Sequence, residues 1–158
     1  MRETLFRAKL TPNSEWIEGS LLIGNNYNFI ITDEDYQDVV ATQSALVCES
    51  HLIEKDNKTL GQYIWRKDKN GKKIFEGDIL KSLLYPFQND KGELNYCFEI
   101  IWREDYCSFG FIIHKNPKST DNYMSDGTIG LFDHFESENW EVIGNIYDNP
   151  ELLEEDIK

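Results

Sequence analysis

The chain has 158 residues, a length typical of one domain or of two small subdomains that share a core. Its residues are 40% hydrophobic and 13% aromatic, which is enough for an ordinary core and excludes a wholly disordered protein. The 29 acidic and 16 basic side chains give a net charge of -13, which argues against non-specific binding to nucleic acid or to an anionic membrane.

The charge is unevenly distributed along the chain. Residues 1–65 carry a net charge of -5, residues 66–81 carry +3 and residues 82–158 carry -11. The segment 133–156 contains nine carboxylates and no lysine or arginine. Residues 66–81 are therefore the only basic part of an acidic protein.

The sequence shows no sign of export, membrane insertion or disulfide bonding. The longest uncharged stretch, Gly19–Thr32, is too short to span a bilayer, and the N-terminal residues lack the apolar core of a signal peptide. Cys48, Cys97 and Cys107 are odd in number and include no Cys-x-x-Cys pair. We expect a soluble cytosolic protein with three reduced, mostly packed thiols.

The N-terminal part of the chain is predicted to form β-hairpins. A strand at 4–10 is stopped by turn residues, and the strands 16–23 and 27–31 flank a short Gly-Asn-Asn loop. A further strand is expected at 44–48. The polar segment 54–59 is the best candidate for a linker, so we expect an N-terminal β-hairpin-rich subdomain at 1–58 and a second domain at 59–158.

The second domain is predicted to be a small five-stranded β-barrel with bends at glycines, because closure of the sheet removes its exposed edges. The secondary structure of residues 128–135 is not predicted from the sequence. The expected strands are 60–66, 73–84, 95–102, 109–114 and 140–147.

The stretch 59–81 contains the strongest turn signals of the chain. Asn70 and Gly71 favour a type I′ turn, which needs positive φ at both central residues. Gly77 interrupts an apolar run and indicates a bulge or bend, and Asp78 can cap the backbone amides that such a bend frees.

A short acidic helix is expected at the C-terminus. Asn149 is a suitable N-cap, and Pro150 suits the first helical position. Glutamates in the first turns interact favourably with the helix dipole.

Three blocks of the sequence resemble the signature blocks of the YopX family of phage and prophage proteins. They are FRAKLTPNSEWIEGSLL at 6–22, TLGQYIWRKDKNGKKIFEGDILK at 59–81 and EVIGNIYDNPELL at 141–153. The resemblance implies a β-rich protein with an SH3-like small barrel, encoded by a bacteriophage or prophage and present in the bacterial cytoplasm. It implies no activity, so no functional residues are carried over.

Two features depart from the family pattern. Trp65 stands where a small residue is expected, and the segments 24–56 and 115–139 match none of the family blocks. A function specific to this chain would lie in those segments.

The basic residues around the turn are the candidate interaction surface. They could grip phosphate, with Tyr63, Trp65 and Phe75 stacking on bases. They could also form a soluble hairpin tip that protects the strand edges, or pair with the acidic tail of another copy. The candidate residues are Trp65, Arg66, Lys67, Lys69, Lys72 and Lys73.

No catalytic, metal-binding or cofactor-binding residues are expected. The pairs Glu76 with Asp78 and Glu104 with Asp105 could serve acid–base chemistry, but no nucleophile is tied to them. The sequence has no zinc-site spacing among its soft metal ligands, which are the three cysteines, His51, His114 and His134. The segment Asp121–Gly127 does not have the spacing of a calcium-binding loop. Motifs of nucleotide-binding loops are absent from the sequence.

The function that we expect is a non-enzymatic protein-interaction or self-assembling module. One alternative is a nucleic-acid-binding small barrel that uses the basic hairpin at 66–73, although the net charge disfavours it. Another is an acidic DNA mimic that inhibits a host protein through 133–156. An enzyme would need a pocket in which Glu76, Asp78 or His114 converge.

Overall fold

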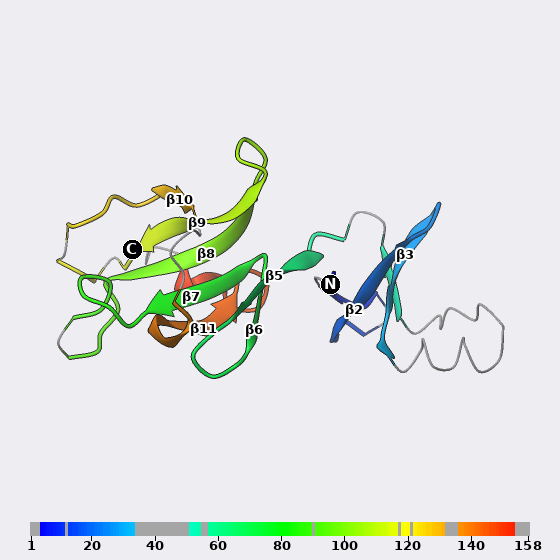
Figure 1. Ribbon diagram of the computed structural model, residues 1–158, viewed down its shortest axis with the longest axis horizontal. Helices are drawn as coiled ribbons and strands as arrows, with labels where there is room; N and C mark the ends of the chain where they lie inside the picture. The colour runs from blue at the N-terminus through cyan, green and yellow to red at the C-terminus, as the bar shows by residue number, and fades with distance from the viewer. Residues whose placement is uncertain are drawn as a thin grey trace. The chain divides into compact units, whose positions relative to one another are not determined.

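The protein folds into antiparallel β-structure in two compact units, Met1–Tyr63 and Ile64–Lys158, in the computed structural model (Figure 1). This confirms the mainly β prediction. No helix in the described part of the chain is long and apolar enough to cross a membrane. The structure describes residues 4–11, 13–33, 51–54, 57–89, 91–116, 118–120, 122–131 and 136–153.

The first unit is built from the two predicted hairpins. Its strands pair in the order β4-β3-β2-β1-β5, all antiparallel. The division between the units falls within β5, and the expected strand at 44–48 lies outside the described residues. The strands are β1 (Phe6–Lys9), β2 (Trp16–Ile23), β3 (Tyr27–Ile31), β4 (Leu52–Glu54) and β5 (Gly61–Lys67).

One face of this sheet carries the core of the first unit, in which Ala8, Leu10, Ile30 and Ile53 are buried. The chain packs closely here, because a Cβ atom on Gly19 would collide with the backbone carbonyl of Ile31. Substitution of Gly19 would therefore push β2 away from β3.

The second unit combines the end of β5 with a five-stranded sheet of order β10-β9-β8-β7-β11. β5 pairs with β6, and β8 and β9 form a long hairpin that projects from the unit (Figure 1). The elements are β6 (Lys73–Phe75), β7 (Asp78–Ser82), β8 (Tyr96–Arg103), β9 (Ser108–Lys115), β10 (Ile129–Leu131), β11 (Trp140–Asn145) and the 3-10 helices η2 (Ser137–Asn139) and η3 (Pro150–Leu152).

Phe98 lies at the centre of the core of the second unit. Its ring makes edge-to-face contacts with Phe87, Phe111 and Trp140 at centroid distances of 5.1, 5.4 and 4.9 Å. Alternation along β8 directs Tyr96, Phe98 and Ile100 to this core. The other buried members are Ile64, Ile74, Leu80, Ile113 and Val142.

Three expectations about the second unit need correction. The described strands form open sheets, so the closed five-stranded barrel is not observed among these residues. The strand expected at 73–84 is two strands, because the chain bends at Gly77, where φ is 80°. The described part of the C-terminal helix is the single 3-10 turn η3, and Asn149 makes no side-chain cap hydrogen bond there.

The two described cysteines differ in environment. Burial, together with the nearby Asp126 and Glu99 carboxylates, raises the pKa of Cys97 to about 12. Cys107 is exposed in the β8–β9 turn, so it is not one of the packed thiols that are expected to be the majority, and Cys48 lies outside the described residues.

We expect iodoacetamide at pH 8 to label Cys107 at least about 100-fold faster than Cys97, because the thiolate is the reactive form. Peptide mass spectrometry of the labelled protein measures both rates in one sample. Equal labelling of the two residues in the folded protein would contradict the burial of Cys97.

Candidate interaction surface

The β5–β6 loop, residues 68–72, is built around a four-residue turn. Gly71 N donates to Asp68 O at 2.9 Å, and Asp68 N donates to Lys72 O at 2.9 Å. Gly71 has a φ of 80°, whereas Lys69 and Asn70 do not have positive φ. The predicted type I′ turn at Asn70 and Gly71 is therefore wrong, and the geometry fits a type I turn centred on Lys69 and Asn70.

Asp68 is the centre of this loop. Its Oδ1 accepts hydrogen bonds from the backbone N of Asn70 at 2.8 Å and of Lys72 at 2.9 Å. Its Oδ2 accepts one from Val142 N on β11 at 3.1 Å. Burial alone would raise the pKa of Asp68, but these three backbone donors and the nearby Lys72 ammonium hold that pKa below its usual value of 3.8.

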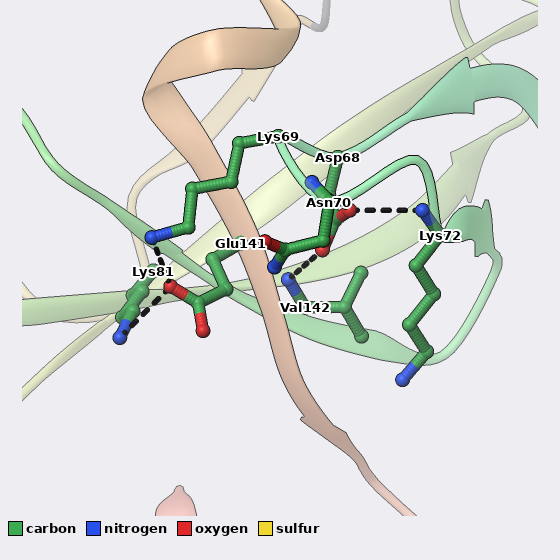
Figure 2. A network of polar contacts seen from close by, with 7 residues as sticks. All are labelled: Asp68, Lys69, Asn70, Lys72, Lys81, Glu141 and Val142. Carbon is green, nitrogen blue, oxygen red and sulfur yellow. Dashed lines mark hydrogen bonds and ion pairs between the residues drawn. The ribbon is translucent and has the colours of Figure 1, made fainter.

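Lys69 joins the loop to the same strand by two contacts. Its backbone N donates to Trp140 O at 3.0 Å, and its Nζ lies 2.7 Å from Glu141 Oε2. Lys81 Nζ reaches the same oxygen at 3.1 Å, so two ammonium groups flank one carboxylate (Figure 2). Hydrogen bonds from Lys69 and Lys81 lower the pKa of Glu141.

The loop is thus attached to β11 of the same chain. One lysine of the basic tip, Lys69, thus pairs with Glu141 of the acidic segment in its own molecule, and the pairing with the acidic tail of another copy stays a prediction. Sequence reasoning did not single out Asp68. The signal that could have found it is an aspartate at the first position of a turn, where its carboxylate can accept hydrogen bonds from the following amides.

The outward part of the predicted surface lies at the end of β5. Arg66 and Lys67 have exposed side chains. The ring centroids of Trp65 and Phe109 are 6.2 Å apart, and those of Phe109 and Trp102 are 5.1 Å apart. Both pairs are arranged edge to face. Trp102 is 43% exposed, so this series of aromatic contacts ends at a ring that is open to solvent.

Trp65 has a φ of 58°, in the left-handed region. A residue with a Cβ atom loses about 1 to 2 kcal/mol there, whereas glycine does not. The left-handed backbone would account for the small residue that the family resemblance leads us to expect at this position. The contact between Trp65 and Phe109 offsets part of that cost.

The remaining residues of the predicted surface, and the two other rings proposed for stacking, differ in accessibility. Lys73 is half-buried. Tyr63 and Phe75 are buried, so two of the three rings proposed for base stacking cannot reach a base. Lys72 has an exposed side chain, although its backbone N is bound to Asp68.

Gly77 and Asp78 have structural roles at the bend between β6 and β7. Gly77 N donates to Ile100 O at 2.8 Å, and Gly77 O accepts from Ile146 N at 3.0 Å. The buried Asp78 accepts a hydrogen bond from Phe75 N at 2.8 Å through Oδ2. These contacts connect the bend to β8 and to the segment that follows β11.

A shallow hollow of about 510 Å³ lies beside the β5–β6 loop. Asp68, Lys69, Glu136, Ser137 and Glu138 line it. Both oxygens of Asp68 already accept hydrogen bonds, so this carboxylate is not a free base. The described wall of the hollow on the side of η2 is acidic, because Glu138 of η2 and the preceding Glu136 line it.

The other candidate catalytic groups are not brought together with these residues. His114 Nε2 lies 2.9 Å from Glu99 Oε2, across β8 and β9. Asp105 pairs with Arg103 on the exposed β8–β9 turn. Among the described residues, no group of three or more His, Cys, Asp or Glu side chains could hold a metal ion. His134 and Asp121 lie outside the described part.

Comparison with protein families shows to which family the chain belongs. The sequence pattern of one family, described as YopX protein, matches residues 5–154. The chain belongs to the YopX family. Among curated proteins, no similar sequence was found.

The YopX match confirms the resemblance based on three sequence blocks, all of which lie inside the matched residues. It also includes Trp65 and the two segments that match no quoted block. The family description names no activity, so membership identifies the lineage of the chain and leaves its function to the surface described above.

Proposed function

We propose that this member of the YopX family is a non-enzymatic protein-interaction module that self-associates. Its interaction surface consists of Trp65, Arg66, Lys67 and Trp102. The observation that carries this proposal is the exposure of Arg66 and Lys67 directly after Trp65, whose ring is connected through Phe109 to the exposed Trp102 ring, in a protein with a net charge of -13.

The loop contacts of Asp68 support this proposal. Asp68 and Lys69 attach the residues that follow Lys67 to β11, so the end of β5 is held in place before a partner arrives. A surface that is already ordered loses less conformational entropy on binding. Tryptophan and arginine are the residues that most often carry binding energy at protein interfaces.

The composition of the chain suggests an acidic surface of a second copy as the partner. Residues 82–158 carry -11, and the segment 133–156 contains nine carboxylates. Among the described residues of this segment, Glu141 is neutralised within the chain by Lys69 and Lys81. Pairing of Arg66 and Lys67 with the remainder would be attractive at low salt.

The two alternatives have less support. In nucleic-acid binding through 66–73, the buried Tyr63 and Phe75 could not stack on bases. Lys69 is less available to phosphate, because it is bound to Glu141. A DNA mimic needs an array of free carboxylates, but Glu141, within the acidic segment, already contacts two lysines.

We also propose that the second unit is an opened form of an SH3-like small barrel. Ile64 of β5 and Ile74 of β6 pack in the same core cluster as Leu80, Phe98 and Val142. A hairpin that covers one sheet in this way encloses a single core, as a small barrel does. A phage or prophage origin and a place in the bacterial cytoplasm follow from the family resemblance as further proposals.

Equilibrium sedimentation at about 50 mM and about 500 mM salt tests the self-association, because salt screens contacts between exposed charges. We expect the wild-type protein to associate at low salt. The double variant Arg66→Glu with Lys67→Glu should weaken association at least tenfold, which corresponds to about 1.4 kcal/mol.

The matched control carries Lys58→Glu and Lys91→Glu, which reverse two exposed lysines elsewhere and change the net charge equally. This control should associate within about threefold of the wild type, a difference below 1 kcal/mol. A wild-type protein that stays monomeric at low salt and high concentration would rule out the self-association.

A further inference from the structure

The hollow beside the β5–β6 loop adjoins the exposed cations at the end of β5. Arg66 and Lys67, which we call the basic end, are the last residues of β5. The next two residues, Asp68 and Lys69, line the hollow of about 510 Å³. Its other lining residues, all of which are exposed, are Glu136, Ser137 and Glu138. A cationic site and an acidic hollow are therefore neighbours within the second unit.

The charges of these two sites match. The hollow is lined by three carboxylates and one ammonium, which leave a formal charge of -2. The Lys69 ammonium is bound to Glu141 at 2.7 Å (Figure 2), and the Asp68 carboxylate accepts three backbone hydrogen bonds. The charges of the hollow that remain open are those of Glu136 and Glu138, and the basic end carries two positive charges to meet them.

Within the described part of the chain, neither the basic end nor the two glutamates take part in an ion pair. Glu136 Oε2 accepts a hydrogen bond from Asn139 Nδ2 at 2.9 Å, but this donor is neutral and leaves the charge uncompensated. The basic end therefore does not bind the hollow of its own molecule. Both sites keep their charges for contact with a partner.

We propose that the hollow receives the Arg66 and Lys67 side chains of a second copy, and that two copies exchange these contacts about a two-fold axis. The inference rests on the self-association proposed above and names the acidic surface at which it occurs. Because the basic end directly precedes the hollow-lining Asp68, a two-fold axis between the two sites brings each basic end to the hollow of the other copy. One dimer then contains the same contact twice.

The hollow offers the basic end a better site than a flat acidic surface does. Arginine donates hydrogen bonds in a fork geometry that matches a carboxylate. Charges that are partly enclosed are screened by salt less than fully exposed charges. Glu141, which also lies beside the loop, already binds Lys69 and Lys81 and is not available to a second copy.

An exchange of charge between the two sites tests this contact. Glu136→Lys with Glu138→Lys, the hollow variant, reverses the charge of the hollow, and Arg66→Glu with Lys67→Glu reverses the basic end. Each of these double variants alone brings like charges together at both contacts of the dimer. An equimolar mixture restores opposite charges at both contacts, because each variant meets its complement in the other.

Equilibrium sedimentation at about 50 mM salt is the measurement, with circular dichroism to confirm folding. We expect the hollow variant to associate at least tenfold more weakly than the wild type, and the mixture to return to within about threefold of it. The matched control, Glu93→Lys with Glu151→Lys, reverses two exposed glutamates elsewhere and should not weaken association. Both variants remove the same negative charge, which by itself reduces repulsion between acidic copies.

Glu136→Gln with Glu138→Gln is a second, milder variant that removes both charges and keeps an acceptor for Asn139. It should weaken association at least about threefold, because it adds no repulsion.

A folded hollow variant that associates like the wild type, or a mixture that stays monomeric, would overturn the inference. If Arg66→Glu with Lys67→Glu still abolished association in that case, the proposed function would stand without it. A wild-type protein that is monomeric at low salt would refute both. Species larger than a dimer would indicate head-to-tail contacts and overturn the two-fold arrangement.

Discussion

Replacement of Phe98 by alanine should lower the free energy of unfolding by about 3 to 5 kcal/mol, the usual loss for a large core aromatic. Phe98 is buried and makes edge-to-face contacts with Phe87, Phe111 and Trp140. Its removal leaves a cavity between β8 and β11 and ends all three ring contacts. Urea unfolding monitored by circular dichroism and by tryptophan fluorescence measures the loss.

Tyr85→Ala is the control for this loss, because Tyr85 is also aromatic but is 78% exposed. Its substitution should change the free energy of unfolding by less than about 0.5 kcal/mol. A loss below about 1 kcal/mol for Phe98→Ala would contradict the placement of this ring at the centre of the core.

Asp68→Asn should lower the free energy of unfolding at pH 7 by about 2 to 3 kcal/mol, since an amide cannot accept hydrogen bonds at both positions. The oxygen of Asn can still accept from the backbone of Asn70 and Lys72. Its NH₂ group then faces the buried Val142 N–H, so two donors oppose each other. Urea unfolding of the folded variant gives the difference.

The effect of Asp68 should disappear in acid. The pKa of Asp68 is below 3.8 in the folded protein, so unfolding makes this carboxyl easier to protonate. Its contribution is complete above the unfolded pKa and is lost as the pH falls from about 4 through the folded pKa. The wild type and Asp68→Asn should therefore approach each other in stability once the pH falls below the folded pKa of Asp68.

Asp105→Asn is the matched control for the pH experiment. Asp105 also has a lowered pKa, through its hydrogen bond to Arg103, but this pair lies on the exposed β8–β9 turn. Surface pairs contribute little, so the control should lose less than about 0.5 kcal/mol at pH 7. Equal losses for the two variants would show that the position of Asp68 has no special role.

The local patterns in the sequence predicted most of the strands. β2 and β3 coincide with the predicted ranges 16–23 and 27–31, because a short Gly-Asn-Asn loop between alternating runs determines a hairpin. β4 was not predicted, since three residues carry too little periodicity. The split between β6 and β7 needed the positive φ at Gly77, which the sequence indicates only as a bend.

The candidate surface was predicted in composition but not in geometry. Charge identified the residues around Asn70, yet charge alone does not tell which lysines face solvent and which bind the same chain. Lys69 turns to Glu141, which is 72 positions away in the sequence, and Asp68 reaches Val142. Contacts of such separation depend on how β11 docks, and no local pattern encodes that.

Lysine acetylation followed by mass spectrometry tests most directly whether the basic hairpin has one bound part and one free part. Each rate is measured on the full chain at low salt, in dilute and in concentrated solution. Lys69 and Lys81 should react slowly at both concentrations, because both bind Glu141. Lys67 should react fast when dilute and at least about threefold more slowly when concentrated, as an interface covers it.

Lys91 serves as the internal reference in the same spectra, because its side chain is exposed on a different loop. Its rate should not depend on concentration. Reaction of Lys69 as fast as Lys67 in dilute solution would contradict the bound state of Lys69. A rate for Lys67 relative to Lys91 that is the same at both concentrations would contradict an interface at Lys67.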